Sequence, residues 1–67
     1  MSQRIEQSIL ACLREESPLD LSIEEIAAKT GIHRNTVSKY VLGLEKEGKI
    51  KISRIVGRAK MYVVTKK

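Results

Sequence analysis

The 67-residue sequence predicts an α+β fold in which three helices are followed by a two-stranded antiparallel β-hairpin. Three observations lead to this prediction. Apolar residues recur with the 3.6-residue period of a helix in three successive segments. From Ile50 onward the period changes to two, which is typical of strands. Between the two alternating segments, Gly57 supplies the backbone freedom that a tight hairpin turn needs.

The first helix is expected to end near residue 16. Ile5, Ile9 and Leu13 are spaced at i, i+4 and i+8, so they share one face of a helix. Ser17 precedes Pro18, and a residue before proline is disfavoured in the helical conformation. The helix should therefore stop before this pair.

The second helix has recognisable signals at both ends. Ser22 and Glu25 have the spacing of a capping box, in which each side chain accepts a hydrogen bond from the other residue's amide. Leu21 and Ile26 stand at the flanking hydrophobic staple positions. Gly31 is expected to end the helix.

The third helix is expected over residues 33–47, with Gly48 ending it. Its buried stripe should consist of Val37, Tyr40, Val41 and Leu44. His33 takes the N-cap position, where histidine is a poorer cap than Ser, Thr or Asp. We therefore predict that the start of this helix is completed only when a phosphate binds there.

The C-terminal hairpin follows from alternation. Ile50 and Ile52 alternate with Lys51 and Ser53, and Tyr62 and Val64 alternate with Met61 and Val63. Residues 1–67 are expected to form one domain, with Lys66 and Lys67 as a frayed tail.

Charge is distributed unevenly along the chain, whose net charge is +5. Residues 1–28 contain two basic and six acidic residues, a net charge of −4. Residues 29–67 contain eleven basic and two acidic residues, a net charge of +9. This asymmetry favours a face built for a polyanion, with nucleic acid as the first choice and an anionic membrane as the second. The alternative is a basic protein with no particular partner.

Several classes of protein are disfavoured by the sequence. The longest apolar run, residues 9–13, is too short to span a membrane, and no secretory signal is visible. Cys12 is the single cysteine, so it has no intramolecular disulfide partner and is expected to lie in the core. No catalytic triad, carboxylate pair in an apolar setting or glycine-rich phosphate loop is present. We expect a cytoplasmic non-enzyme without cofactor or metal.

The segment LSIEEIAAKTGIHRNTVSKYVLGLEKEGKI, followed by a basic hairpin, resembles the winged helix-turn-helix family. It is similar to the DNA-binding core of MarR, ArsR and Lrp-like prokaryotic transcriptional regulators. The motifs that carry the resemblance are IEEIAAKTGIHRNTVSKYV, the turn at Gly31-Ile32, LEKEGKI and the closing YVVT. The resemblance covers roughly residues 5–65. It implies that the third helix is a recognition helix in the major groove and that the hairpin is a wing on the minor groove or backbone.

The residue types of the third helix are consistent with that implication. If its apolar stripe is buried, helical geometry turns the remaining side chains outward. Arg can bridge guanine O6 and N7, Asn can pair with adenine, and Ser or Thr can reach bases or phosphates. The alternative is an ordinary solvated helix face. The candidate DNA-binding residues of this helix are His33, Arg34, Asn35, Thr36, Ser38 and Lys39.

The wing, residues 53–61, adds three basic candidates, Arg54, Arg58 and Lys60. Arg58 is the strongest of them because it follows Gly57 at the tip. The alternative reading is that these charges protect an exposed sheet edge from pairing with other chains. For Lys49 and Lys51, a contact to phosphate and no contact are equally expected.

Taken together, the sequence predicts a sequence-specific double-stranded DNA-binding protein, a small transcriptional regulator that is nucleoid-associated and acts as a homodimer. Contacts to about five phosphates per subunit would make log K fall with log salt with a slope near −4.5. One alternative is a protein-interaction winged helix within a larger nucleic-acid-processing assembly. A recogniser of left-handed DNA is another, but Ser38 and Leu42 stand where such domains have Asn and Tyr.

Overall fold

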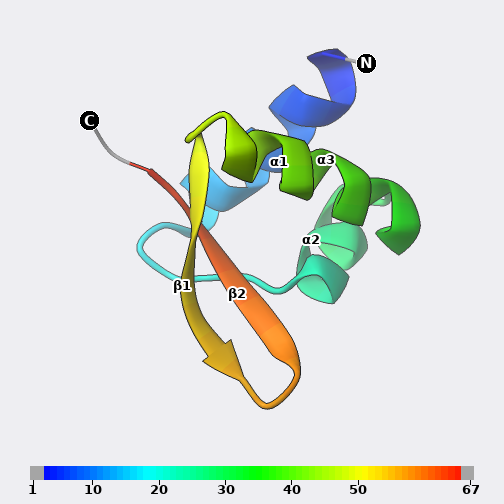
Figure 1. Cartoon of the computed structure of the whole chain (residues 1–67). Coiled ribbons are helices and arrows are strands. Elements are labelled where there is room, and N and C mark those ends of the chain that lie inside the picture. The colour runs from blue at the N-terminus through cyan, green and yellow to red at the C-terminus, as the bar shows by residue number, and fades with distance from the viewer. Residues whose placement is uncertain (1–2, 66–67) are drawn as a thin grey trace.

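The computed structural model describes residues 3–65 and confirms the predicted architecture of three helices followed by a two-stranded antiparallel sheet (Figure 1). The elements in chain order are α1 (Gln3–Glu16), α2 (Ile23–Thr30), α3 (Arg34–Lys46), β1 (Ile50–Val56) and β2 (Ala59–Val64). The helices gather at one end of the molecule, and the hairpin extends away from them (Figure 1). The predicted frayed tail, Lys66-Lys67, lies outside the described residues.

The start and end of α2 form as their local sequence predicts. The Ser22 amide donates to Glu25 Oε1 at 2.9 Å, and the Glu25 amide donates to Ser22 Oγ at 3.3 Å. Both hydrogen bonds of the capping box are therefore present. Gly31 has a φ of 76°, a left-handed conformation that costs other residues energy, and its amide donates to the Ala27 carbonyl.

Helix α3 is two residues shorter than predicted, because the terminal residues of the expected range are its caps. His33 is the N-cap and Glu47 is the C-cap. The predicted stripe is confirmed in Val37, Val41 and Leu44, which are buried, while Tyr40 is half-buried. This stripe fixes which side of α3 is left facing solvent.

The wing is formed by the antiparallel pairing of β1 and β2. Ile50 pairs with Val64 and Ile52 pairs with Tyr62, so the two expected alternations meet in register. A register shift between Ile52 and Arg54 marks a bulge. Leu21, on the connection between α1 and α2, adds a short bridge to the other edge of β2, which the sequence did not suggest.

This bridge consists of two backbone hydrogen bonds. The Leu21 amide donates to the Tyr62 carbonyl at 3.0 Å, and the Tyr62 amide donates to the Leu21 carbonyl at 2.8 Å. At Tyr62, which we call the root of the wing, β2 is therefore hydrogen-bonded along both edges. The tip of the wing, around Gly57, consists of β1 and β2 alone. In Figure 1 the connection from α1 to α2 crosses beside the hairpin at this point.

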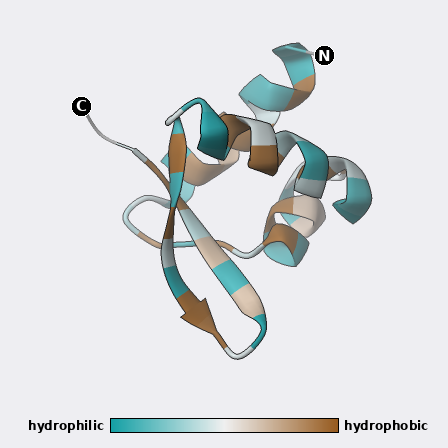
Figure 2. Ribbon diagram, in the orientation of Figure 1, coloured by the Kyte–Doolittle hydropathy of each residue, from teal (hydrophilic) through white to brown (hydrophobic). Residues whose placement is uncertain are grey.

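The core is aliphatic, with Tyr62 as its one aromatic member among the described residues. It draws on every helix and both strands, so the helices and the root of the wing pack as one unit. The tip is different: Ile55 and Val56 are 62% and 52% exposed, and the corresponding end of β1 is brown in Figure 2. The core residues are Ile9, Leu10, Cys12, Leu13, Leu21, Ile26, Val37, Val41, Leu44, Ile50 and Tyr62.

Candidate nucleic-acid interface

The start of α3 is complete without any phosphate. The Asn35 amide donates to His33 Nδ1 at 3.1 Å, and the Val37 amide donates to the His33 carbonyl at 3.0 Å. The imidazole therefore accepts the hydrogen bond that a Ser or Asp side chain usually accepts at this position. The prediction that this helix start waits for phosphate is wrong, because the histidine ring itself reaches the second helical amide.

The solvent face of α3 carries most of the predicted residues. Five of the six candidates are exposed: His33, Arg34, Asn35, Ser38 and Lys39. Thr36 is half-buried, so it presents less of its side chain to solvent than its neighbours do. This face contains hydrogen-bond donors, acceptors and two cations, and the first turn of α3 contains no acidic residue. It combines groups that can contact base edges with groups that can contact phosphates.

Arg34 is engaged by a carboxylate that the sequence analysis did not place on this surface. Its Nη1 lies 3.3 Å from Glu24 Oε2, and both side chains are largely exposed. Glu24 belongs to the first turn of α2, which packs beside α3. The pairing spans ten residues and depends on how the two helices pack, so no local pattern in the sequence signals it.

The three wing candidates have different surroundings. Arg58 follows Gly57 in the turn, where Gly57 has a φ of 60°, and Lys60 lies on β2; both are exposed. Arg54 is held by Asp20, with Nε 2.8 Å from Oδ2 and Nη2 3.3 Å from Oδ1. Arg58 and Lys60 thus extend from the outer part of the wing, whereas the Arg54 guanidinium is bound to the connection before α2.

The Asp20 carboxylate is well fitted to this role. Its side chain is only 12% exposed, and Arg54 reaches it with two nitrogens. Hydrogen bonding from Arg54, supported by Ser53 and the charge of Arg54, holds the pKa of Asp20 below its ordinary value of 3.8. Two hydrogen bonds to one carboxylate fix the orientation of the guanidinium as well as its position.

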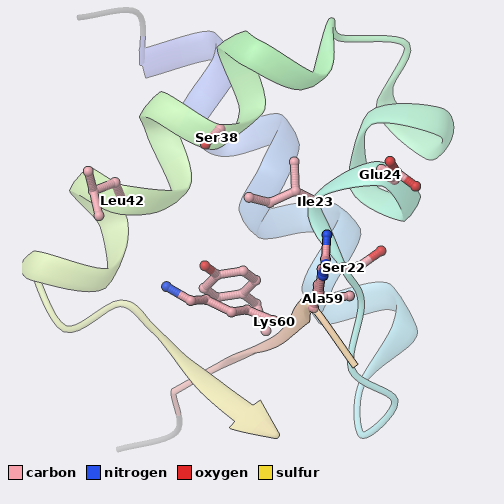
Figure 3. A pocket seen from close by; sticks show the side chains of 9 residues that line it. Ser22, Ile23, Glu24, Ser38, Leu42, Ala59 and Lys60 are labelled. Atoms are coloured by element: carbon pink, nitrogen blue, oxygen red, sulfur yellow. The ribbon is translucent and has the colours of Figure 1, made fainter. Parts of the chain in front are cut away.

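The solvent face of α3 and the wing meet at a hollow of about 450 Å³ (Figure 3). Figure 3 shows Ser38 and Leu42 on α3 at one side and Ala59 and Lys60 on β2 at another, with Ile23 and Glu24 contributed by α2. The structure therefore brings together predicted residues that lie far apart in the sequence. Lining residues are Ser22, Ile23, Glu24, Ser38, Leu42, Arg58, Ala59, Lys60 and Tyr62.

The hollow is lined by both apolar and polar side chains. Burial raises the pKa of the Tyr62 phenol, and the charge of Glu45 raises this pKa further. The phenol is therefore neutral at physiological pH and can act as a hydrogen-bond donor. Ser22 and Ser38 add hydroxyl groups, and Arg58 and Lys60 add positive charge.

The remaining candidates have simpler placements. Lys49 Nζ lies 3.5 Å from Glu47 Oε1, and Lys51 is exposed on β1. Among residues 3–65, His, Cys, Asp and Glu side chains nowhere form a group of three or more that could hold a metal ion. Over the same residues, no helix has the length and apolar content needed to cross a membrane. Cys12 is a buried free thiol, as expected.

Comparison with known proteins agrees with this geometry. No curated protein sequence matches the chain. A family model described as HTH domain matches residues 5–62, which include all five helices and strands in whole or in large part. The helices in this range and the hairpin that follows them have the arrangement of a winged helix. The chain therefore belongs to the helix-turn-helix domain family, as a DNA-binding domain of the winged-helix type.

Proposed function

We propose that the protein is a sequence-specific double-stranded DNA-binding transcriptional regulator without enzymatic activity. In this proposal, α3 enters the major groove and the wing lies against the minor groove or the backbone. The observation that carries it is the hollow, where Ser38 and Leu42 on the solvent face of α3 come together with two exposed cations of the outer wing, Arg58 and Lys60. DNA lying across this surface would meet both elements at once.

The residues of this surface would divide their work by chemistry. Arg34 and Asn35, at the start of α3, have side chains able to make bidentate contacts to guanine and adenine. Lys39, Arg58 and Lys60 supply positive charge, which attracts the phosphate of any sequence. In this scheme the helix sets the sequence preference and the lysines and wing arginine supply affinity.

The dimensions of the protein support a homodimer on DNA. The longest extent is 28 Å, so one copy covers at most about eight base pairs at about 3.4 Å per base pair. Two copies reading half-sites one helical turn apart would double the sequence that is read. We therefore propose that two copies occupy one site.

Selection from random duplexes, followed by binding measurements on the selected and a scrambled duplex, tests this function. We expect a recurring sequence to be enriched and two copies to bind per duplex, measured by sedimentation. Asn35→Ala should weaken binding to the selected duplex roughly 5- to 150-fold, because a bidentate base contact is worth about 1–3 kcal/mol. Binding to the scrambled duplex should change little.

Gln7→Ala is the matched control, because Gln7 carries the same amide group and is exposed on α1. It should leave both affinities unchanged. If the protein binds no duplex at low salt, the proposed function is refuted and the protein-interaction role becomes the better explanation. If one copy alone saturates the selected site, the homodimer is refuted.

A further inference from the structure

The bulge in β1 changes the direction in which Arg54 points. Ile52 pairs with Tyr62 and packs against the core, so in a regular strand Arg54, two residues later, would lie on the same core-facing side. The register shift instead pairs Arg54 with Met61, the neighbour of Tyr62, and cross-strand partners lie on one face of a sheet. Arg54 is therefore on the outer face of the hairpin, which faces away from the core.

On this outer face the Arg54 side chain spans β2. Strand β2 lies between β1 and the short bridge at Leu21, and Asp20 immediately precedes that bridge. Leu21 is buried in the core, so the side chain of the preceding residue, Asp20, points to the opposite side of the sheet. The guanidinium reaches the Asp20 carboxylate with two nitrogens, at 2.8 and 3.3 Å. This ion pair joins β1 to the connection before α2.

Geometry and burial distinguish this contact from an ordinary surface ion pair. The Asp20 side chain is only 12% exposed, and both of its oxygens accept hydrogen bonds from one guanidinium. Hydrogen bonding from Arg54 is the main cause that lowers the pKa of Asp20. By contrast, Lys29 and Glu16 make one contact of 3.6 Å, and the Glu16 side chain is 32% exposed. The bidentate geometry therefore holds β1 and the connection in one arrangement, which a single exposed contact does not.

The outer part of the wing has few other contacts that could fix its direction. Residues 55–60 are all exposed, and the two strands there pair only with each other. A two-stranded ribbon without further packing is marginally stable in water and twists readily. Arg58 and Lys60, the two wing cations proposed to contact phosphate, stand on this segment. Their position relative to α3 therefore depends on how the outer wing is held at its base.

We infer that Asp20 and Arg54 are positioning residues, which hold the outer wing and its two cations at the angle to α3 that DNA binding requires. This inference rests on the proposed function. Arg54 is not among the residues that line the hollow, and it lies on the face of the hairpin opposite to Lys60 and Tyr62. It thus acts on DNA binding through the wing and contacts no phosphate of its own. Without the ion pair, binding has to order the outer wing as well.

Removing either partner should weaken DNA binding without changing its salt dependence. We expect Arg54→Ala and Asp20→Ala each to lower affinity about 3- to 10-fold, on the selected and the scrambled duplex alike, because the complex must then immobilise the outer wing. The slope of log K against log salt should keep its wild-type value, since no phosphate contact is lost.

A direct contact between Arg54 and phosphate would give a different pattern. Arg54→Ala would then flatten the salt slope by about 0.9, as expected for the loss of one phosphate contact. Asp20→Ala, which frees the guanidinium, would act in the opposite direction and raise affinity. This pattern would overturn the inference, and so would an unchanged affinity in both variants.

Lys29→Ala and Glu16→Ala are the matched controls. They remove the same two kinds of charge from an ion pair that joins α1 to α2. Both should leave affinity within about twofold of the wild type. Losses as large as those of Arg54→Ala and Asp20→Ala would show a general sensitivity to net charge or to ion pairs, and would overturn the inference.

Two further measurements separate positioning of the wing from loss of the fold. In a background that lacks both wing cations, Arg58→Ala with Lys60→Ala, the change Arg54→Ala should alter affinity less than twofold, because no wing contact is left to position. A full effect in that background would overturn the inference.

The second measurement needs no DNA. Backbone order parameters of residues 55–60, from nuclear magnetic relaxation, should fall in Arg54→Ala and Asp20→Ala and stay unchanged in the two controls. Unchanged order parameters in all four variants would overturn the inference while leaving the proposed function intact. If the wild type forms no complex with any duplex, the proposed function and the inference both fail.

Discussion

Arg58→Ala should remove one phosphate contact and therefore flatten the salt dependence of DNA binding. Ion pairs within the protein reduce the number of cations that are free to bind phosphate. Arg34, Arg54 and Lys49 have carboxylate partners in Glu24, Asp20 and Glu47. On the proposed interface this leaves three cations for phosphate, Lys39, Arg58 and Lys60.

The magnitude follows from these three contacts. Three neutralised phosphates give a slope of log K against log salt of about −2.7 per protein copy, and two give about −1.8. From 50 to 200 mM salt, the wild type should therefore lose about 40-fold in affinity and Arg58→Ala about 12-fold. This estimate is shallower than the slope near −4.5 predicted from the sequence, because it leaves out cations that have carboxylate partners in the structure.

Fluorescence anisotropy of a labelled duplex, titrated at four salt concentrations, measures these slopes. Arg14→Ala is the control, because Arg14 is an exposed arginine at the end of α1 that does not line the hollow between α3 and the wing. It should leave the slope at the wild-type value. If Arg58→Ala and Arg14→Ala change the slope equally, the wing tip does not contact phosphate. A wild-type complex that is insensitive to salt would refute the whole estimate.

Three further predictions concern stability, which urea unfolding followed by circular dichroism measures. Leu44→Ala should lower the free energy of unfolding by about 2–5 kcal/mol, because it opens a cavity in the core. Leu42→Ala, at a side chain that is 56% exposed, should change it by less than about 0.5 kcal/mol. Similar losses in the two variants would contradict the burial of Leu44. Gly31→Ala should cost about 1–2 kcal/mol through its φ of 76° alone, since no atom lies within 4 Å of the added Cβ; an unchanged midpoint would show that the turn does not need this conformation. Because the folded pKa of Asp20 lies below its ordinary value, the pairing with Arg54 stabilises the fold above about pH 4, and this contribution is lost as pH falls through the lowered pKa. The difference in stability between wild type and Asp20→Asn should therefore shrink from pH 5 to pH 2, and a constant difference would exclude the ion pair as its source.

The parts of the fold that the sequence predicts well are those decided by near neighbours. The buried stripe of α3, the capping box of α2 and the left-handed Gly31 each depend on residues within about one or two helical turns. The start of α3 is an instructive exception. Cap preferences rank histidine low, yet the ring of His33 makes the capping bond, because its Nδ1 reaches the Asn35 amide.

Features that depend on tertiary packing were not predicted. Leu21 pairs with Tyr62 although the two lie 41 residues apart, and a single bridge residue has no period that could reveal it. The partners of Arg34 and Arg54 lie 10 and 34 residues away. The sequence identified the basic residues of the candidate interface, but their availability for phosphate depends on which carboxylates the fold places beside them.

The bridge between Leu21 and Tyr62 also ties the wing to the segment that contains α3. It closes residues 21–62 into a loop that contains both α2 and α3, so the helix proposed to read DNA lies between two segments that are hydrogen-bonded to each other. A fragment ending before Ile50 would lose two core side chains, Ile50 and Tyr62, together with the partner of Leu21. The hairpin is therefore part of the folded core and cannot be removed without loss of core contacts. A transfer of α3 to another protein should therefore include α1 and residues 21–65. Substitutions in β1 should be confined to the residues after the bulge, whose side chains are exposed.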